Sequence, residues 1–133
     1  MGYSSKWFSR SELECHGNGC CDGLPPGGVD DRLLEMLDSI RERIGGPLEV
    51  SCVYRCPIHN AEVGGVPGST HEKAIAADIL QPDYMPDFGT FKWHIYNNGV
   101  IDPNEMGIGE YASSGFIHAD LRGYAARWTE DDY

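Results

Sequence analysis

The feature of this sequence that most constrains its fold is an amphipathic segment over residues 30–44. Apolar side chains recur there at the three- and four-residue spacing of a helix, at Leu33, Leu34, Leu37, Ile40 and Ile44. Two aspartates begin the segment, two arginines lie near its end and a Gly-Gly pair follows it, which is the charge order and stop signal of a helix. The pattern predicts a helix with one face buried against another layer.

The other apolar segments are short and mostly favour strands. Four of them, rich in alternating or continuous apolar residues, lie at residues 48–54, 76–80, 106–111 and 115–121. The polar turn 112–114 between the last two predicts an antiparallel hairpin. Residues 88–96 favour a second helix, although Gly89 weakens that pattern. We therefore expect an α+β fold, with a small, mostly antiparallel sheet backed by helices.

The length predicts the domain organisation. A chain of 133 residues has a common size for one domain, and one core is enough to stabilise it. We expect a single domain over residues 1–133. Residues 1–28 contain several glycines, a Pro-Pro pair and three of the five cysteines, so we expect them to form a loop-rich N-terminal arm.

Charge and hydropathy argue against two classes of partner. A formal net charge of −11 opposes binding to the phosphate backbone, so we expect no nucleic-acid partner. No apolar run approaches the ~20 residues that a membrane span needs. The first residues also lack the apolar stretch of an export signal. We expect no membrane span, and synthesis in the cytoplasm.

Three residues have the chemistry and setting of metal ligands. A catalytic zinc site needs three protein ligands, usually imidazoles and carboxylates, and one open position. Asp78 and His118 each lie in a short apolar run, and His71 lies on a loop before the first of these runs. A carboxylate buried in such a run is costly unless it is paired or bound to a metal. The alternative from the residues alone is two ordinary histidines and an aspartate that caps a turn.

Three blocks of sequence resemble the zinc D-Ala-D-Ala peptidases. Residues 69–79 look like the Ser-x-His-x-x-Gly-x-Ala-x-Asp-Ile signature of that family. Residues 54–57 and 60–65 resemble its Ser-Gly-Tyr-Arg and Asn-x-x-Val-Gly-Gly segment. Residues 107–111 and 116–128 resemble its Gly-x-Gly-x-Tyr and Val-His-x-Asp-x-Arg segment. The blocks occur in the order of the family.

The resemblance implies a fold, a cofactor and a substrate class. The fold would be the small α+β fold shared with the hedgehog signalling domain, and the cofactor would be Zn²⁺ bound by His71, Asp78 and His118. Arg55 and Ser69 would bind the substrate, and Arg55 would also stabilise charge on the scissile carbonyl. The partner would be a peptide of bacterial peptidoglycan, cleaved by a carboxypeptidase or an endopeptidase of the D,D or L,D type.

The sequence departs from the family where the general base is expected. Many relatives place an acidic residue or a histidine just before the last ligand, but residues 113–116 are Ser, Ser, Gly and Phe. Our first choice is therefore Glu110, across the expected hairpin, followed by Asp120, which shares a strand face with His118. Asp120 fits equally well the role of orienting a ligand, and Glu72 is a weaker third candidate. A non-catalytic zinc-containing module that binds a peptide or wall fragment is the alternative function.

A second departure concerns the loop between the first two ligands. Ala74 stands where the family has glycine. If that position requires a positive φ angle, Ala74 strains the loop.

The cysteines allow two interpretations. Cys15, Cys20 and Cys21 cluster in the arm, while Cys52 and Cys56 flank Tyr54-Arg55. Disulfides would suit a protein that works outside the cytoplasm, and a thiolate zinc site would suit a reducing compartment. Because no Cys-x-x-Cys spacing is present, we expect a disulfide to Cys56.

The resemblance and the missing export signal together suggest a route to the substrate. An enzyme of the cell wall without its own signal would be a phage or prophage product, released by lysis or carried on a phage particle.

Overall fold

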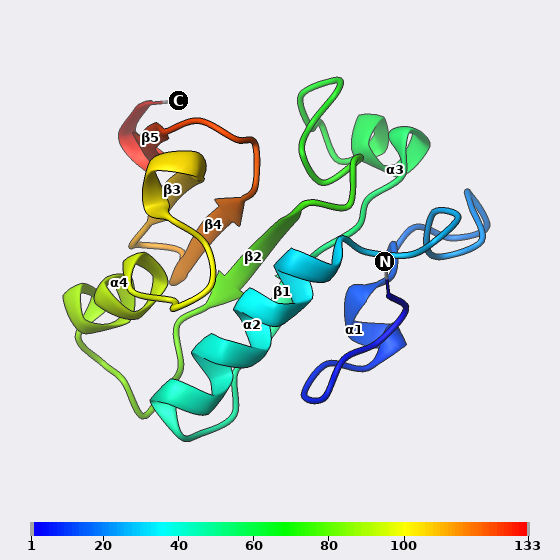
Figure 1. The fold of residues 1–133 in the computed structure, drawn as a ribbon. Coiled ribbons are helices and arrows are strands. Elements are labelled where there is room, and N and C mark those ends of the chain that lie inside the picture. Colours follow the sequence, from blue (N-terminus) through cyan, green and yellow to red (C-terminus); the bar gives the residue numbers. More distant parts are fainter. Residues whose placement is uncertain (1, 133) are drawn as a thin grey trace.

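The computed structural model describes residues 2–132 (Figure 1). The helices are α1 (Arg10–Leu13), α2 (Asp31–Ile44), α3 (Pro57–Glu62) and α4 (Phe88–Tyr96), with 3-10 helices η1 (Pro103–Glu105) and η2 (Glu130–Asp132). The strands are β1 (Val50–Cys52), β2 (Ala76–Leu80), β3 (Gly107–Tyr111), β4 (Phe116–Asp120) and β5 (Ala126–Thr129). None of the helices in residues 2–132 is long and apolar enough to cross a membrane.

Within the described residues the strands form one five-stranded sheet in the order β1-β2-β4-β3-β5. The β1–β2, β2–β4 and β3–β4 pairs are antiparallel, but β5 runs parallel to β3. The expected α+β class and the β3–β4 hairpin are confirmed, whereas the sheet is mixed rather than mostly antiparallel. The difference arises because the chain after β4 crosses to the free edge of β3 and adds there a strand in the same direction as β3.

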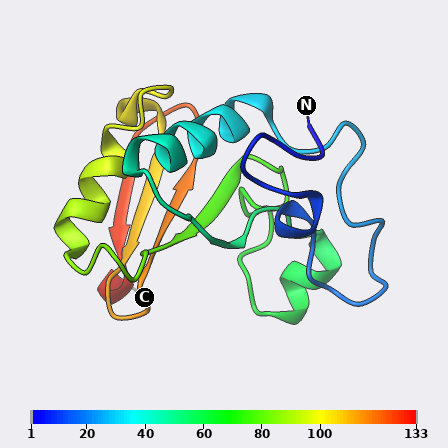
Figure 2. The same ribbon diagram turned by 90° about the horizontal axis from the view of Figure 1, so that it is seen from below.

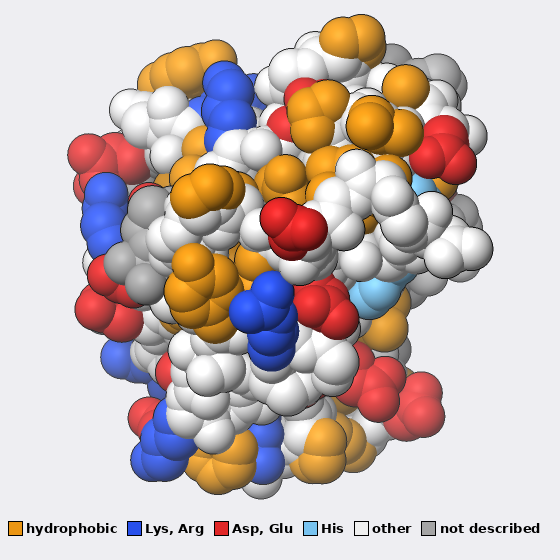
Figure 3. Space-filling view, turned by 90° about the vertical axis from the view of Figure 1, so that its right-hand side faces the viewer, with side chains coloured by type: hydrophobic (Ala, Val, Ile, Leu, Met, Phe, Trp, Pro, Cys, Tyr) orange, Lys and Arg blue, Asp and Glu red, His pale blue; other side chains and the backbone are white. Residues whose placement is uncertain are grey.

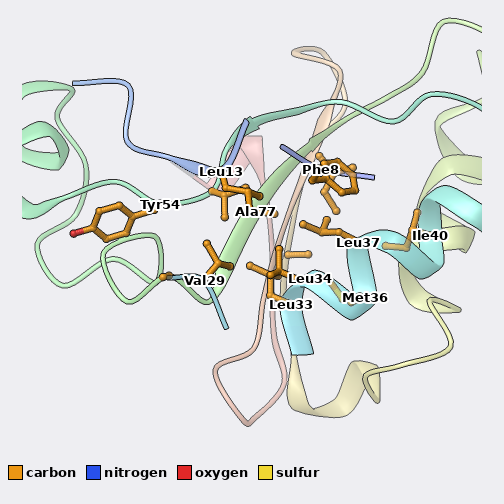
Figure 4. Close-up of a cluster of buried hydrophobic side chains, with 14 of the residues drawn as sticks. Phe8, Leu13, Val29, Leu33, Leu34, Met36, Leu37, Ile40, Tyr54 and Ala77 are labelled. Atoms are coloured by element: carbon orange, nitrogen blue, oxygen red, sulfur yellow. The ribbon is translucent and has the colours of Figure 1, made fainter. Parts of the chain in front are cut away.

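The long helix α2 forms where the sequence predicts it. Asp30 caps its start, since the Asp30 side chain accepts a hydrogen bond from the Arg32 backbone N–H. Gly45 ends it at a φ of 71°, the left-handed conformation that glycine adopts without strain. The buried side of α2 packs against residues of the arm and of β2 (Figure 4), in a cluster that includes Leu33, Leu34, Met36, Leu37, Ile40, Phe8, Leu13, Val29 and Ala77. Complete burial of each large side chain contributes about 2 kcal/mol.

The sheet has one face covered by helices and one face left for a site. Helices α2 and α4 lie on the same side of the strands (Figures 1 and 2). Side chains opposite each other across paired strands share a face, so the fully buried Ile79, Ile108 and Ile117 face these helices. The intervening residues of the same strands, including Asp78 and His118, project from the other face.

The arm lies at the β1 edge of the sheet, beside α3 (Figure 2). It is irregular apart from α1, as the sequence predicts, but it is attached to the core: the Tyr54 N–H donates to the Leu13 carbonyl, and Phe8 and Leu24 are buried. All five cysteines are unpaired. The predicted disulfide to Cys56 is therefore wrong for this structure, where Cys56 Sγ lies 3.3 Å from Cys20 Sγ, beyond bonding distance.

Candidate metal centre

Three ligand-type side chains meet on the face of the sheet that the helices leave open. Asp78 of β2 lies opposite His118 of β4 in the antiparallel pair, so both side chains project in the same direction. His71 reaches them from the loop between α3 and β2. Asp78 Oδ1 is 3.3 Å from His71 Nε2 and 3.0 Å from His118 Nδ1. The structure thus places the three predicted ligands side by side.

The remaining ring nitrogens have partners that orient both imidazoles. His71 Nδ1 is 2.8 Å from the Val53 carbonyl oxygen, and His118 Nε2 is 2.7 Å from Asp120 Oδ2. Both partners are acceptors, so each of these nitrogens carries the proton and donates it. In the neutral imidazoles, His71 Nε2 and His118 Nδ1 therefore present lone pairs toward Asp78. Such outer hydrogen bonds are the usual support of histidine metal ligands.

This donor set fits a metal ion. Two lone-pair nitrogens and a carboxylate oxygen repel one another unless a positive charge lies among them. Two imidazoles and one carboxylate are a common set for catalytic zinc, and three protein ligands leave a position open. His71 is buried and Asp78 is only partly exposed, so water screens the repulsion poorly. Protons or a metal ion must supply the charge.

The pKa values of the two histidines and of Asp78 reflect the same need for positive charge among them. Burial lowers the pKa of His71, but hydrogen bonding and attraction to Asp78 outweigh it and raise that pKa from 6.5 to about 10. Burial also lowers the pKa of His118, which its bonds to Asp120 and Asp78 raise overall. For Asp78, burial raises the pKa, and the two histidines bring it well below its usual range. In the absence of a metal, these shifts favour protonated histidines beside an ionised Asp78.

We expect zinc binding to stabilise the protein more as the pH rises from 6 to 8.5. The raised pKa of His71 means that its protonated form stabilises the metal-free fold fully below about pH 6.5, and that this contribution is lost as the pH rises toward 10. Zinc must displace such protons, so its affinity should rise about tenfold per pH unit for each proton displaced. Thermal unfolding with zinc and with chelator, at several pH values, measures the increment. A zinc increment that stays constant over this range would contradict the prediction.

Asp120 lies behind His118 and holds its ring. The Asp120 side chain is fully buried, and Arg122 donates to its two oxygens from Nε at 2.8 Å and Nη2 at 2.7 Å. Thr70 Oγ1 and the Gly107 N–H also donate to this carboxylate. Burial raises its pKa, but Arg122 and His118 bring the pKa well below the usual range. This placement favours the orienting role of Asp120 over that of a general base, since its oxygens already accept hydrogen bonds from these groups and Asp120 is not among the described cavity residues.

Glu110, the other candidate base, is not brought to the site. In the β3–β4 pair it lies opposite Ile117, whereas Gly109 lies opposite His118. Its side chain therefore projects from the helix-covered face, where its carboxylate forms an ion pair with Lys92 of α4 at 3.1 Å. This position does not support Glu110 as the general base, because the sheet separates its side chain from the ligands.

A cavity of about 590 Å³ opens over the three ligands. Arg55, Ser69 and Thr70 lie on its wall, as the resemblance implies for the first two. Three cationic side chains line it, namely Arg55, Lys73 and Arg122, while Asp78 is the only carboxylate among the described residues on its wall. In a chain of net charge −11, this local excess of positive charge favours an anionic ligand group.

Arg55 is held in place by a buried amide. Its Nε donates to Asn60 Oδ1 at 2.8 Å, and Asn60 Nδ2 donates to Glu72 Oε2 at 2.8 Å. Asn60 is 1% exposed, and a Cβ at Gly65 would collide with its side-chain oxygen. The Asn-x-x-Val-Gly-Gly segment thus has a physical purpose, which is to fix the arginine. Glu72 belongs to this network and is not among the cavity residues.

Aromatic rings also line the cavity. Tyr111 and Phe116 stack with their ring centres 4.5 Å apart, and Trp128 Nε1 donates to the Tyr111 hydroxyl at 2.8 Å. Tyr124 completes this lining. The Trp128 ring lies over Gly109, where a Cβ would collide with the indole. The glycine therefore leaves the space that the tryptophan needs.

Gly109→Ala is expected to destabilise the fold by about 1–3 kcal/mol, because the added methyl displaces the Trp128 ring. Denaturant unfolding gives the free energy. Gly89→Ala is the matched control: a Cβ there meets only Asp87 at 3.6 Å or more, and alanine favours the helix. Equal free energies of unfolding for the two variants would contradict this role of Gly109.

The loop before β2 contains the strain that the sequence suggests. Ala74 has a φ of 57° and is the one non-glycine residue with a positive φ among the described residues. That conformation costs an alanine about 1 kcal/mol relative to the right-handed one. The Ala74 methyl is fully buried, and its carbonyl accepts from the Asp30 N–H at the start of α2. These contacts hold the strained residue in place.

Three residues at the site were assigned no role there from the sequence. Thr70 contacts Asp120, and Tyr124 lines the cavity. Cys52 lies across the β1–β2 pair from Asp78, with its sulfur 3.6 Å from His71 Nδ1. Because that nitrogen already donates to the Val53 carbonyl, Cys52 lies on the orienting side of the imidazole. The sequence signal for Cys52 is its position two residues before Tyr54-Arg55, the pair that resembles the family segment.

Comparison with known proteins identifies a family. The family model described as Peptidase M15 matches residues 6–120. The matched range includes His71, Asp78 and His118, together with Arg55 and Asp120. A comparison with curated proteins finds no match.

Proposed function

The chain belongs to the Peptidase M15 family, and from that premise we propose that it is a zinc peptidase that hydrolyses a peptide bond in the stem or cross-link peptides of bacterial peptidoglycan. Membership makes it a metallopeptidase. The proposal assigns the metal to His71, Asp78 and His118. The observation that carries it is that His71 Nε2 and His118 Nδ1 lie 3.3 Å and 3.0 Å from Asp78 Oδ1, and that all three residues line one cavity.

The chemistry divides between the ion and the side chains around it. When bound, zinc would supply a Lewis acid that polarises a carbonyl and acidifies water. Arg55 would bind the oxygen of the scissile carbonyl and stabilise its developing charge, since its guanidinium is already oriented by Asn60. Ser69 lies on the same wall and would hydrogen-bond the peptide. Asp120 would keep the His118 ring aligned.

The lining of the cavity supports a peptide with an anionic end. Arg55, Lys73 and Arg122 offer positive charge, and Tyr111, Phe116 and Trp128 offer an apolar wall. A stem peptide of peptidoglycan carries a free carboxylate beside small alanine side chains, which matches both features. This cavity provides the local attraction that a chain with a net charge of −11 lacks as a whole.

One observation favours a second candidate. Among the described residues that line the cavity, no carboxylate other than the ligand Asp78 is available to accept a proton. A module that keeps the metal and uses the cavity to hold a peptide or wall fragment needs no such group. The second candidate is therefore a peptide-binding module of the same fold.

The deciding experiment is digestion of purified muropeptides by the zinc-loaded protein, with mass spectrometry of the products. A peptidase releases alanine or splits the cross-link and so generates a new amine, whereas a binding module retains the fragment unchanged. Chelator should abolish cleavage, and added zinc should restore it. Retention without any cleavage by the zinc-loaded protein would refute the peptidase.

Arg55→Lys is expected to lower kcat by more than about tenfold while zinc content stays the same. Lysine keeps the charge but lacks the planar fork that Asn60 orients and that matches a carbonyl or carboxylate oxygen. Steady-state kinetics together with metal analysis separates the two effects. An unchanged kcat would remove Arg55 from the proposed machinery.

A further inference from the structure

Four of the five cysteines form a compact group away from the cavity. Cys15, Cys20 and Cys21 come from the arm, and Cys56 comes from the residue before α3. Their sulfur atoms all lie within 4.8 Å of one another. Cys20 Sγ is 3.9 Å from Cys15 Sγ and 3.3 Å from Cys56 Sγ. We call this group the four-cysteine cluster.

The separations match sulfur atoms arranged around one ion. Zinc–sulfur bonds of about 2.3 Å in a tetrahedron place the sulfurs about 3.8 Å apart. A disulfide instead requires a single partner at about 2.05 Å. Each sulfur of the cluster has three others within 4.8 Å and none at bonding distance, since all four residues are unpaired. The group therefore has the form of a fourfold site rather than of two pairs.

The surrounding backbone supports thiolates at these positions. The Gly23 N–H donates to Cys21 Sγ, and the His59 N–H donates to Cys56 Sγ, each at 3.4 Å. Hydrogen bonds to sulfur favour the charged form that a metal requires, and they orient the ligand. Both cysteines thus have a feature expected of a metal ligand and unnecessary for a free thiol.

The loop that carries three of the cysteines is shaped around the sulfurs. The Cys15 N–H donates to the Gly23 carbonyl at 2.8 Å and closes the loop. Gly19 and Gly23 have φ angles of 72° and 97°, which only glycine adopts readily. A Cβ at Gly17 would collide with Cys20 Sγ. Three glycines in this loop therefore serve the approach of the sulfurs.

We propose that Cys15, Cys20, Cys21 and Cys56 bind a structural Zn²⁺ ion that attaches the arm to the start of α3. Four thiolates complete a tetrahedron and leave no open position, so the site stabilises and does not catalyse. Tetrahedral sulfur sites select zinc or iron, and our assignment is zinc. Cys15 and Cys56 are buried, whereas Cys21 is exposed and offers a path for the ion. Figure 3 shows this side of the molecule, where hydrophobic and acidic side chains intermingle.

The proposed ion would also fix one wall of the cavity. Cys56 directly follows Arg55, and the Arg55 N–H donates to the His71 carbonyl. A metal that immobilises Cys56 therefore restrains the backbone of Arg55, in addition to the hydrogen bond from the Arg55 N–H to the His71 carbonyl. This role is independent of whether the cavity performs peptide hydrolysis.

The test measures zinc in a protein that lacks the other site. His118→Ala, purified under reducing conditions, should retain about one zinc per chain, and addition of Cys20→Ser or Cys56→Ser should remove it. Cys52→Ser, which changes the one cysteine outside the cluster, is the matched control and should retain it. Cobalt substituted for zinc should show thiolate-to-metal charge-transfer absorption in His118→Ala and in the Cys52→Ser control, and in neither cluster variant.

Thiol titration provides a second readout that does not depend on the folding of variants. In the proposed state of the wild-type protein, one thiol reacts before chelation and five react after chelator and denaturant. Four thiols missing after that treatment without reductant would indicate disulfides and overturn the proposal. Five reactive thiols in the native protein with no zinc released would overturn it as well. Iron in place of zinc would overturn the assignment of the ion.

Discussion

His118→Ala is expected to lower kcat/KM by at least about 1,000-fold, equal to about 4 kcal/mol of transition-state stabilisation. The substitution removes the metal-binding atom Nδ1, which lies 3.0 Å from Asp78 Oδ1. It also frees the carboxylate of Asp120 from its bond to the ring. Of the three assigned ligands only His71 and Asp78 remain, which is one fewer than a catalytic zinc site requires. Kinetics on muropeptides and metal analysis of the purified protein measure the two losses.

His94→Ala is the matched control for this variant. His94 lies on α4, beside Trp93 and on the side of the sheet that the helices cover. It should lose neither metal at the cavity nor activity. The assignment of His118 as a ligand would fail if its alanine variant bound zinc at the cavity with unchanged affinity. Because the four-cysteine cluster is proposed to hold a second ion, binding must be followed by titration rather than by total zinc alone.

Asp120→Asn should weaken zinc binding at the cavity by about 10- to 100-fold and reduce the free energy of unfolding by about 3 kcal/mol. The first effect follows because the carboxylate that fixes the His118 ring at 2.7 Å is lost. The second follows because Arg122 loses its charged partner at a buried position. The value is at the lower end for a buried ion pair, because Arg122 keeps 24% of its side-chain exposure. Zinc titration and denaturant unfolding of the metal-free protein separate the two.

Glu110→Gln is the control for Asp120→Asn, since it alters a carboxylate on the same sheet but on the opposite face. It breaks only the partly exposed pair with Lys92, worth less than about 1 kcal/mol. Zinc affinity and kcat should stay within about twofold of the original values. A large fall in kcat for Glu110→Gln would support Glu110 as the general base after all. An unchanged zinc affinity in Asp120→Asn would deny Asp120 its orienting role.

The regular elements with strong local patterns follow from the sequence. Helix α2 is read from its apolar spacing and caps, and strands β2 and β4 are read from short apolar runs between turn signals. The parallel strand β5 has no such signal: its residues alternate between partly buried and exposed. Its direction depends on where the chain returns after β4. Helix α3 also lacks a sequence signal, because six residues with a proline at their start give no periodicity.

The site shows where local patterns cease to be informative. The three ligands follow from chemistry and motif, and Asp120 shares the face of His118 because it lies two residues away on one strand. Glu110 required the register between two strands, and a shift of one residue reverses the face of every side chain. The four-cysteine cluster could not be predicted from the sequence. Cys56 is distant from the arm in sequence, and spacing alone says nothing about which sulfurs meet.

The order of the strands in the sheet predicts different local stabilities for the three ligands of the metal centre. Strands β2 and β4, which carry Asp78 and His118, are interior strands with a partner on each side, whereas His71 lies on the irregular loop before β2. Hydrogen exchange should be slowest in such interior strands and faster in the loop. An ion can therefore enter or leave through local opening around His71, at a free energy far below that of global unfolding, while two of its three ligands stay in place.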